Sequence, residues 1–116
     1  MNPRGPEAVV QRQFEAYNAR DMAAWLATYA DDAQQFQHPA TLLASGHAQI
    51  RARTQPRFAE PQLRAELLRR TVIGELVIDH EIVRTGSSRI ELVCVYRVRQ
   101  GLIRSAIFAF DPMGMP

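Results

Sequence analysis

The spacing of apolar residues predicts helices at the start of the chain. Pro6 stands where the first turn of a helix tolerates proline. One buried stripe then follows at the i, i+4 and i+7 spacing of a helix, formed by Val10, Phe14 and Tyr17. Asn18 can end this helix in a left-handed conformation. We therefore expect a helix from Pro6 to about Asn18.

Two further helices are expected before any long strand. Asp21 can cap a second helix, whose apolar residues are Met22, Trp25, Leu26 and Tyr29. A short strand holding Phe36 ends at His38, which a proline follows. In the next helical segment Ser45 is the expected N-cap, and Pro56 limits its length.

The pattern changes to strands from residue 63 onward. Segments 63–73, 76–84, 89–98 and 102–110 are rich in Val, Ile, Leu and aromatic residues, with Gly74, TGSS and RQG between them. Such short connections imply antiparallel hairpins. Helices followed by an antiparallel meander predict an α+β fold with the helices packed on one face of the sheet.

The RQG turn predicts how the last two strands pair. A three-residue loop needs a positive φ only at its last position, where Gly101 stands, so we expect this loop rather than a two-residue turn. The expected pairs are Val98 with Leu102, Tyr96 with Arg104, Cys94 with Ala106, Leu92 with Phe108 and Ile90 with Phe110.

Both faces of this hairpin are apolar at their centres. The opposite face would carry Val93, Val95, Ile103, Ile107 and Ala109, with Glu91 and Arg97 toward its ends. An antiparallel sheet with one solvated face shows polar alternation instead. The helices can cover one face, and a second copy of the chain is the simplest cover for the other, which predicts a homodimer.

Composition narrows the classes of function. The 116 residues suit one domain, 1–116, with 113–116 as a tail. All 14 basic residues are arginines, which excludes lysine chemistry. The net charge of +2 is too weak to indicate nucleic acid, and no apolar run is long enough to span a membrane. One cysteine and a polar N-terminus lead us to expect a cytoplasmic protein.

Three phrases of the sequence carry a family resemblance. The stretch YNARDMAAWLATYADDAQQFQHP, the following SGHAQI and the hairpin end YRVRQGLIRSAIFAF resemble the NTF2-like superfamily, in particular its SnoaL-like and ketosteroid-isomerase-like proteins. The resemblance implies a cone-shaped, cystatin-like fold in which a curved antiparallel sheet wraps three N-terminal helices. It also implies a ligand cavity and a dimer joined through the outer face of the sheet.

The resemblance points to the residues of a pocket. Where ketosteroid isomerases have their aspartate base before a proline, this chain has His38. Gln13 stands at the position of their helical tyrosine, and Cys94 at that of their protonated aspartic acid. The usual catalytic set is therefore absent. Further pocket residues are expected at Tyr17, Trp25, Tyr96, Arg104, Phe108 and Phe110.

A second histidine completes the predicted site. Aligning VIDHEIV with the family points Ile78, His80 and Ile82 toward the cavity, and Asp79 and Glu81 outward. A neutral imidazole can accept a proton near pH 7, so His38 is the candidate base and His80 its partner. The expected ligand is a small, apolar, oxygenated molecule, and the expected reaction is an isomerisation, dehydration or aldol-type cyclisation.

Plainer interpretations stay open beside this one. His38 can be a capped loop residue, His80 a core histidine and Cys94 a buried hydrophobe. The spacing of His, Cys, Asp and Glu offers no third ligand for a zinc ion, so we expect neither a metal nor a cofactor. The chain can also be a ligand-binding or dimerisation module that keeps the fold without catalysis.

Overall fold

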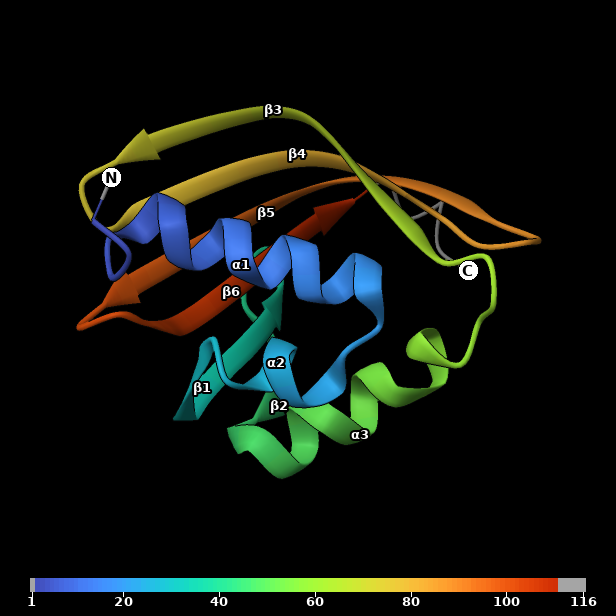
Figure 1. Cartoon of the computed structure of the whole chain (residues 1–116), viewed down its shortest axis with the longest axis horizontal. Helices are drawn as coiled ribbons and strands as arrows, with labels where there is room; N and C mark the ends of the chain where they lie inside the picture. The colour runs from blue at the N-terminus through green and yellow to red at the C-terminus, as the bar shows by residue number, and fades with distance from the viewer. Residues whose placement is uncertain (1, 111–116) are drawn as a thin grey trace.

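A computed structural model describes residues 2–110, so the tail expected at 113–116 lies outside the described residues. Figure 1 shows a strongly curved sheet with helices on its concave side. The helices are α1 (Pro6–Ala19), α2 (Met22–Leu26) and α3 (Gly46–Phe58). The strands are β1 (Tyr29–Gln37), β2 (Thr41–Ser45), β3 (Arg64–Ile73), β4 (Leu76–Arg84), β5 (Arg89–Arg99) and β6 (Leu102–Phe110).

The six strands form one sheet in the order β2-β1-β6-β5-β4-β3. Consecutive strands from β3 to β6 pair antiparallel, as the short connections predicted. The pairing of β1 with β6 is parallel, so the sheet is mixed and the expectation of a fully antiparallel sheet is wrong. No hairpin turn constrains this pair, because α3 and four strands separate β1 from β6 along the chain.

The second predicted helix is shorter than expected, and a long strand precedes α3. Tyr29 begins β1, which has nine residues, instead of continuing α2. The hydroxyl of Thr28 donates to the carbonyl of Trp25 at 2.7 Å, a local bond that competes with helix continuation. Asp21 caps α2 as predicted, since its side chain accepts from the backbone N–H of Ala24 at 3.1 Å.

Asn18 has a different role from the predicted helix end. The left-handed residue at the end of α1 is Arg20, with φ 54°. The Asn18 amide exchanges two hydrogen bonds with the backbone of Ala65, at 2.7 and 3.0 Å. These bonds attach the end of α1 to the start of β3 and hold the helix inside the curve of the sheet (Figure 1).

The β5–β6 turn differs from the predicted three-residue loop. Arg99 pairs with Leu102, and both turn residues have positive φ, 55° at Gln100 and 76° at Gly101. Arg104 supports the strained Gln100 by donating to its side-chain oxygen at 3.1 Å and to the Arg99 carbonyl at 3.0 Å.

Toward the far end of the hairpin the pairs are shifted by two residues from the predicted ones, and next to the turn Val98 faces Ile103, a shift of one. The pairing is irregular just after Arg97, and Cys94 faces Phe108 instead of Ala106. A shift of two keeps each side chain on its predicted face. The residues next to the irregularity do not keep their predicted faces, and Ile103 is fully buried in the core instead of lying on the outer face.

The main core lies between α1, α2 and the concave face of the sheet. Val9 and Val10 of α1 and Val77 of β4 are fully buried there, and Trp25 and Tyr29 join the same cluster. Within residues 2–110 no helix has the length and apolarity needed to cross a membrane.

Candidate functional site

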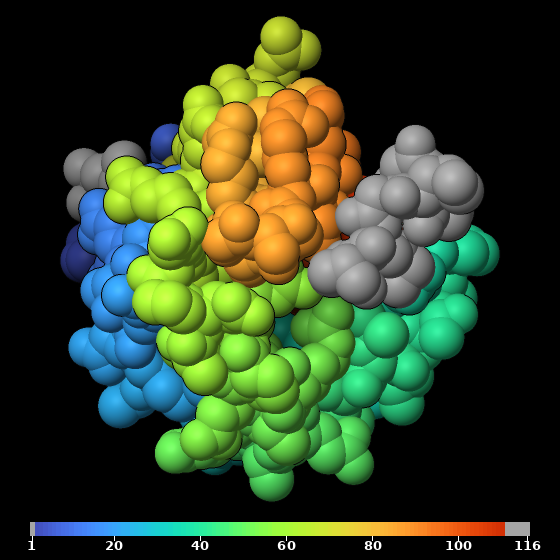
Figure 2. Space-filling model, turned by 90° about the vertical axis from the view of Figure 1, so that its right-hand side faces the viewer, coloured from blue at the N-terminus to red at the C-terminus, as the bar shows by residue number. Residues whose placement is uncertain are grey.

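A cavity of about 350 Å³ lies between the concave face of the sheet and the helices. Figure 2 views the end of the molecule where the β4–β5 hairpin (orange) lies above α3 (green), with a narrow hollow between them. The cavity wall is mostly aromatic and aliphatic, with polar groups at intervals. Its lining residues are Gln13, Phe14, Tyr17, Trp25, Tyr29, Gln35, Arg53, Thr54, Arg57, Ala65, Glu81, Val83, Ile90, Leu92, Cys94, Tyr96, Phe108 and Phe110.

The alternation along β4 places two carboxyl groups on the inner face. Asp79 pairs with Cys94 and Glu81 with Leu92 in the β4–β5 register. Asp79 is fully buried, and Glu81 is 5% exposed and lines the cavity. The predicted orientation of VIDHEIV is therefore wrong. Side chains alternate along a strand, so His80 points to the outer face together with Ile78 and Ile82.

An arginine compensates one of these buried carboxylates. Arg70 of β3 binds Asp79 through two parallel hydrogen bonds of 2.7 and 2.9 Å. The same guanidinium donates to the side-chain oxygen of Gln11 at 2.8 Å. A bidentate pair of this kind keeps a buried aspartate charged. Asp79 thus brings a fixed negative charge close to Glu81, its neighbour on the same face.

Glu81 has an unusually high pKa. Burial of its carboxyl, followed by the negative charge of Asp79, raises the pKa of Glu81 from 4.5 to about 8. Arg70 acts in the opposite direction, but its charge is already engaged by Asp79. At neutral pH the Glu81 carboxyl is thus largely protonated. Because its pKa lies close to neutral pH, a small change in the charges around it is enough to release the proton.

Neutral hydrogen-bonding groups surround this carboxyl. Burial raises the pKa of Tyr17 and of Tyr96, so both phenols keep their protons and can donate. Burial also raises the pKa of the Cys94 thiol well above its usual value. A protonated, enclosed thiol is a poor nucleophile, so Cys94 acts as part of the cavity wall.

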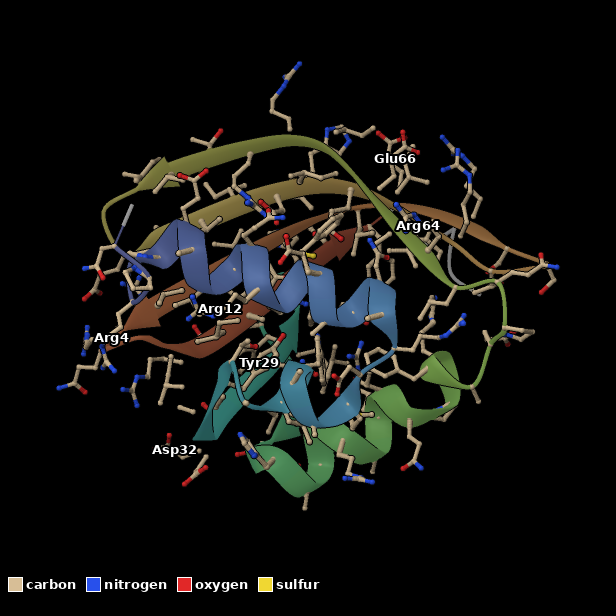
Figure 3. All side chains as sticks on the ribbon, viewed as in Figure 1. Arg4, Arg12, Tyr29, Asp32, Arg64 and Glu66 are labelled. Atoms are coloured by element: carbon tan, nitrogen blue, oxygen red, sulfur yellow. The ribbon has the colours of Figure 1, made fainter. Side chains whose placement is uncertain are left out.

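A polar chain lies on the side of the cavity formed by β1 and α3. The fully buried Gln35 amide lies 3.4 Å from the Tyr29 hydroxyl, to which it donates. Arg53 donates to the side-chain oxygen of Gln35 at 3.2 Å, and its guanidinium carbon lies 5.3 Å from the ring centroid of Phe108. Tyr29, the first residue of β1, lies inside the molecule near α2 (Figure 3).

Two polar atoms of lining residues have no hydrogen-bond partner within residues 2–110. They are the side-chain oxygen of Gln13 and the indole N–H of Trp25. The ring of Trp25 packs against Tyr29 and Phe58, with centroids 5.0 and 5.5 Å away. Unpaired buried polar atoms are uncommon and concentrate at functional sites, which agrees with a site in this cavity.

The structure does not bring the two predicted catalytic histidines together. His38 is exposed after the end of β1, where its backbone N–H donates to the Phe108 carbonyl at 2.8 Å, and it is not a lining residue. His80 lies on β4 and pairs with Glu91 at 2.6 Å on the outer face. Strands β6 and β5 lie between β1 and β4 in the sheet. At the usual spacing of neighbouring strands, β1 and β4 are therefore about 14 Å apart.

The other predicted pocket residues divide into two groups. Arg104 is engaged by the β5–β6 turn and does not line the cavity, because it lies at the irregularity of the pairing, between Ile103 and Ser105. The remaining ones do lie on the cavity wall, and their role in binding stays a prediction. They are Gln13, Tyr17, Trp25, Cys94, Tyr96, Phe108 and Phe110.

Sequence reasoning missed Glu81, Gln35 and Arg53. For Glu81 a signal was available. The alternation in VIDHEIV places either His80 or the pair Asp79 and Glu81 on the inner face, and the arginine-rich strand before it can supply a positive charge for inward carboxylates. Gln35 and Arg53 carry no such signal, because a glutamine in a strand and an arginine on a helix are usual at surfaces. Within the described residues no group of three His, Cys, Asp or Glu side chains is arranged to hold a metal ion.

The chain has an α+β fold in which a curved sheet and its helices enclose a pocket, an arrangement suited to binding a small molecule. The family model of the SnoaL-like domain matches residues 10–106, and the chain belongs to this family. The family resemblance read from the sequence is thereby confirmed. No curated protein matches the chain.

Solved structures share the fold at low sequence identity. A cystatin fold protein from Novosphingobium aromaticivorans has a TM-score of 0.83 and 22% identity, with 90% of this chain and 97% of that chain covered. An NTF2-like protein of unknown function from Burkholderia xenovorans has a TM-score of 0.77 and 20% identity, with 95% and 86% covered. An LEH-like epoxide hydrolase from Mycobacterium tuberculosis has a TM-score of 0.70 and 19% identity, with 92% and 83% covered.

Proposed function

We propose that the cavity binds a small, apolar, oxygenated molecule and that Glu81 exchanges a proton with it. The observation that carries this proposal is a carboxyl on the cavity wall, 5% exposed, with a pKa raised to about 8. General acid–base catalysis works best when the pKa of the group lies near the working pH. Glu81 thus replaces His38 and His80 as the proposed acid–base group: its protonated form donates a proton, and its ionised form, which grows as the pH approaches 8, accepts one.

The neighbours of Glu81 complete a set suited to proton transfer next to a carbonyl. Tyr17 and Tyr96 are lining residues that keep their protons, and either can donate to an oxygen that gains negative charge. Isomerisation, dehydration and aldol-type cyclisation all begin with such a proton transfer. The apolar wall lowers the local dielectric constant and thereby strengthens these hydrogen bonds.

Proton exchange on a simple ketone tests this proposal. 2-Tetralone has acidic hydrogens beside its carbonyl, and NMR in D2O follows their replacement by deuterium. The protein should accelerate this exchange, and Glu81→Gln should reduce the acceleration roughly a hundredfold or more. Glu91→Gln is the matched control, because Glu91 lies on the neighbouring strand, is exposed and faces outward.

The outcomes separate the proposed enzyme from a pure binding module. Exchange that survives Glu81→Gln contradicts the role given to Glu81. Binding of 2-tetralone without accelerated exchange in the unchanged protein indicates a non-catalytic pocket. The aromatic side chains of Trp25, Phe108 and Phe110 on the cavity wall favour that second function, because they provide apolar surface without a group that transfers protons.

We also propose a homodimer joined through the outer face of the sheet. This face carries a half-buried apolar strip of Ile78, Val93, Val95, Ile107 and Ala109. Val95→Arg places a charge at the middle of the strip and should convert a dimer to monomers in sedimentation velocity. A monomer before the substitution contradicts the proposal.

A further inference from the structure

Two arginines line the cavity on the side of α3. Arg53 and Arg57 are one helical turn apart and both belong to the cavity wall. Residues at this spacing lie on the same face of a helix, so the two positive charges are neighbours. Burial, and to a smaller extent the charge of Arg57, lowers the pKa of Arg53. Two like charges beside an apolar cavity are unfavourable unless an anion joins them.

The chain itself supplies no such anion within residues 2–110. Its ion pairs with arginine are Arg70 with Asp79, Arg84 with Glu66, and Arg97 and Arg99 with Glu75. Neither Arg53 nor Arg57 takes part in an ion pair there. The one acid on the described cavity wall is Glu81, and the charges that shift its pKa are those of Asp79 and Arg70.

Arg53 is exposed over much of its surface, but two contacts orient its guanidinium. One of its N–H groups donates to the buried Gln35, and its guanidinium lies over the face of Phe108. A guanidinium has five N–H donors in a fixed planar arrangement, so most of them stay available for a ligand. Arg51, two residues earlier on α3, is exposed like Arg53, but it is not part of the cavity wall.

We propose that the ligand carries a carboxylate and that Arg53 and Arg57 bind it at the α3 side of the cavity. This inference rests on the proposed function, since it assigns a substrate class to the same pocket. The apolar body of the ligand would lie against the aromatic wall, with its reacting carbonyl toward Glu81. Planar guanidinium groups match the two oxygens of a carboxylate better than a single point charge does.

A matched pair of probes tests the inference by isothermal titration calorimetry at pH 7. 2-Naphthylacetate and 2-naphthylacetamide share one carbon skeleton and differ in charge. The carboxylate should bind about tenfold more tightly than the amide, the scale of one charge-assisted interaction. Arg53→Gln and Arg57→Gln should each reduce this preference severalfold, while Arg51→Gln, the matched control on the same helix, should leave it unchanged.

The contrary results are distinct from those that refute catalysis. Equal affinity for the two probes, or a preference that survives the double change of Arg53 and Arg57, overturns the inference. Failure of both probes to bind where 2-tetralone binds also overturns it. In either case, deuterium exchange on 2-tetralone still tests the role of Glu81, because 2-tetralone has no carboxylate for the arginines to bind. Conversely, a carboxylate preference lost in the arginine variants supports the inference even if no exchange is accelerated.

Discussion

Glu81 makes the stability of the protein depend on pH in a way that one substitution should abolish. The folded chain holds the Glu81 proton up to a pKa of about 8, whereas an unfolded chain releases it near 4.5. Between these two values the folded state binds more protons than the unfolded state. The free energy of unfolding therefore falls as pH rises through this window, by up to about 1.4 kcal/mol per pH unit.

The magnitude follows from the width of the window. The full pKa difference corresponds to about 4 to 5 kcal/mol lost between pH 4.5 and pH 8. Water that enters the open cavity screens part of this, so about 2 kcal/mol is the smallest loss we expect. Even that is a large share of the 5 to 15 kcal/mol typical of a small domain.

Glu81→Gln removes the ionisable group and nearly keeps its size. The variant should match the unchanged protein at pH 5 and be more stable by about 2 to 5 kcal/mol at pH 9. Asp79, Arg70, Tyr17 and Cys94 surround Glu81 in both proteins, so the difference between the two curves isolates this carboxyl.

Urea unfolding at a series of pH values provides the assay. Trp25 is the single tryptophan and is 3% exposed, so its fluorescence reports the transition. Glu60→Gln, at an exposed position outside the ion pairs of residues 2–110, is the control and should leave the pH dependence unchanged. Parallel pH curves for the unchanged protein and Glu81→Gln would refute the burial of an ionisable carboxyl in this cavity.

Three further changes test other parts of the structure. Asp79→Asn leaves Arg70 without its bidentate partner and should destabilise the fold by about 3 kcal/mol, whereas Glu66→Gln, in an exposed pair, should cost less than about 1 kcal/mol in urea unfolding. Equal losses would contradict the burial of that pair. Burial raises the pKa of Cys94, so iodoacetamide at pH 8 should modify the folded chain roughly a hundredfold more slowly than the unfolded chain; equal rates would place the thiol at the surface. His38→Ala should leave the deuterium exchange on 2-tetralone within about twofold, and a hundredfold loss would restore the histidine base expected from the sequence.

The sequence was sufficient for most of the elements, but β2 was not predicted and β1 is longer than the short strand expected around Phe36. Periodicity and turn residues predicted α1, the Asp21 cap and the antiparallel run from β3 to β6. The parallel pairing of β1 with β6 joins segments distant along the chain, and no local pattern encodes it. The tight turn at Gln100 was missed because side-chain bonds from Arg104 offset the disfavoured positive φ.

The site was harder to predict than the fold, for one physical reason. If the inward-facing residues of a strand are chosen one position out, every side chain is assigned to the opposite face. VIDHEIV carries candidate catalytic residues on both of its faces. Choosing the inner face of β4 requires knowing that Arg70 lies across from Asp79 and can compensate it. That contact is tertiary, so His80 was placed inside and Glu81 outside when the structure has the reverse.

The central claim is that a ligand binds inside the curve of the sheet, beside Glu81, and not on the outer face beside His80. Methyl NMR during a titration with 2-tetralone distinguishes the two faces. Val83 and Leu92 line the cavity, whereas Ile78 and Val95 belong to the outer face. We predict saturable shifts at Val83 and Leu92 with Ile78 and Val95 unchanged. Shifts confined to Ile78 and Val95 would contradict the account.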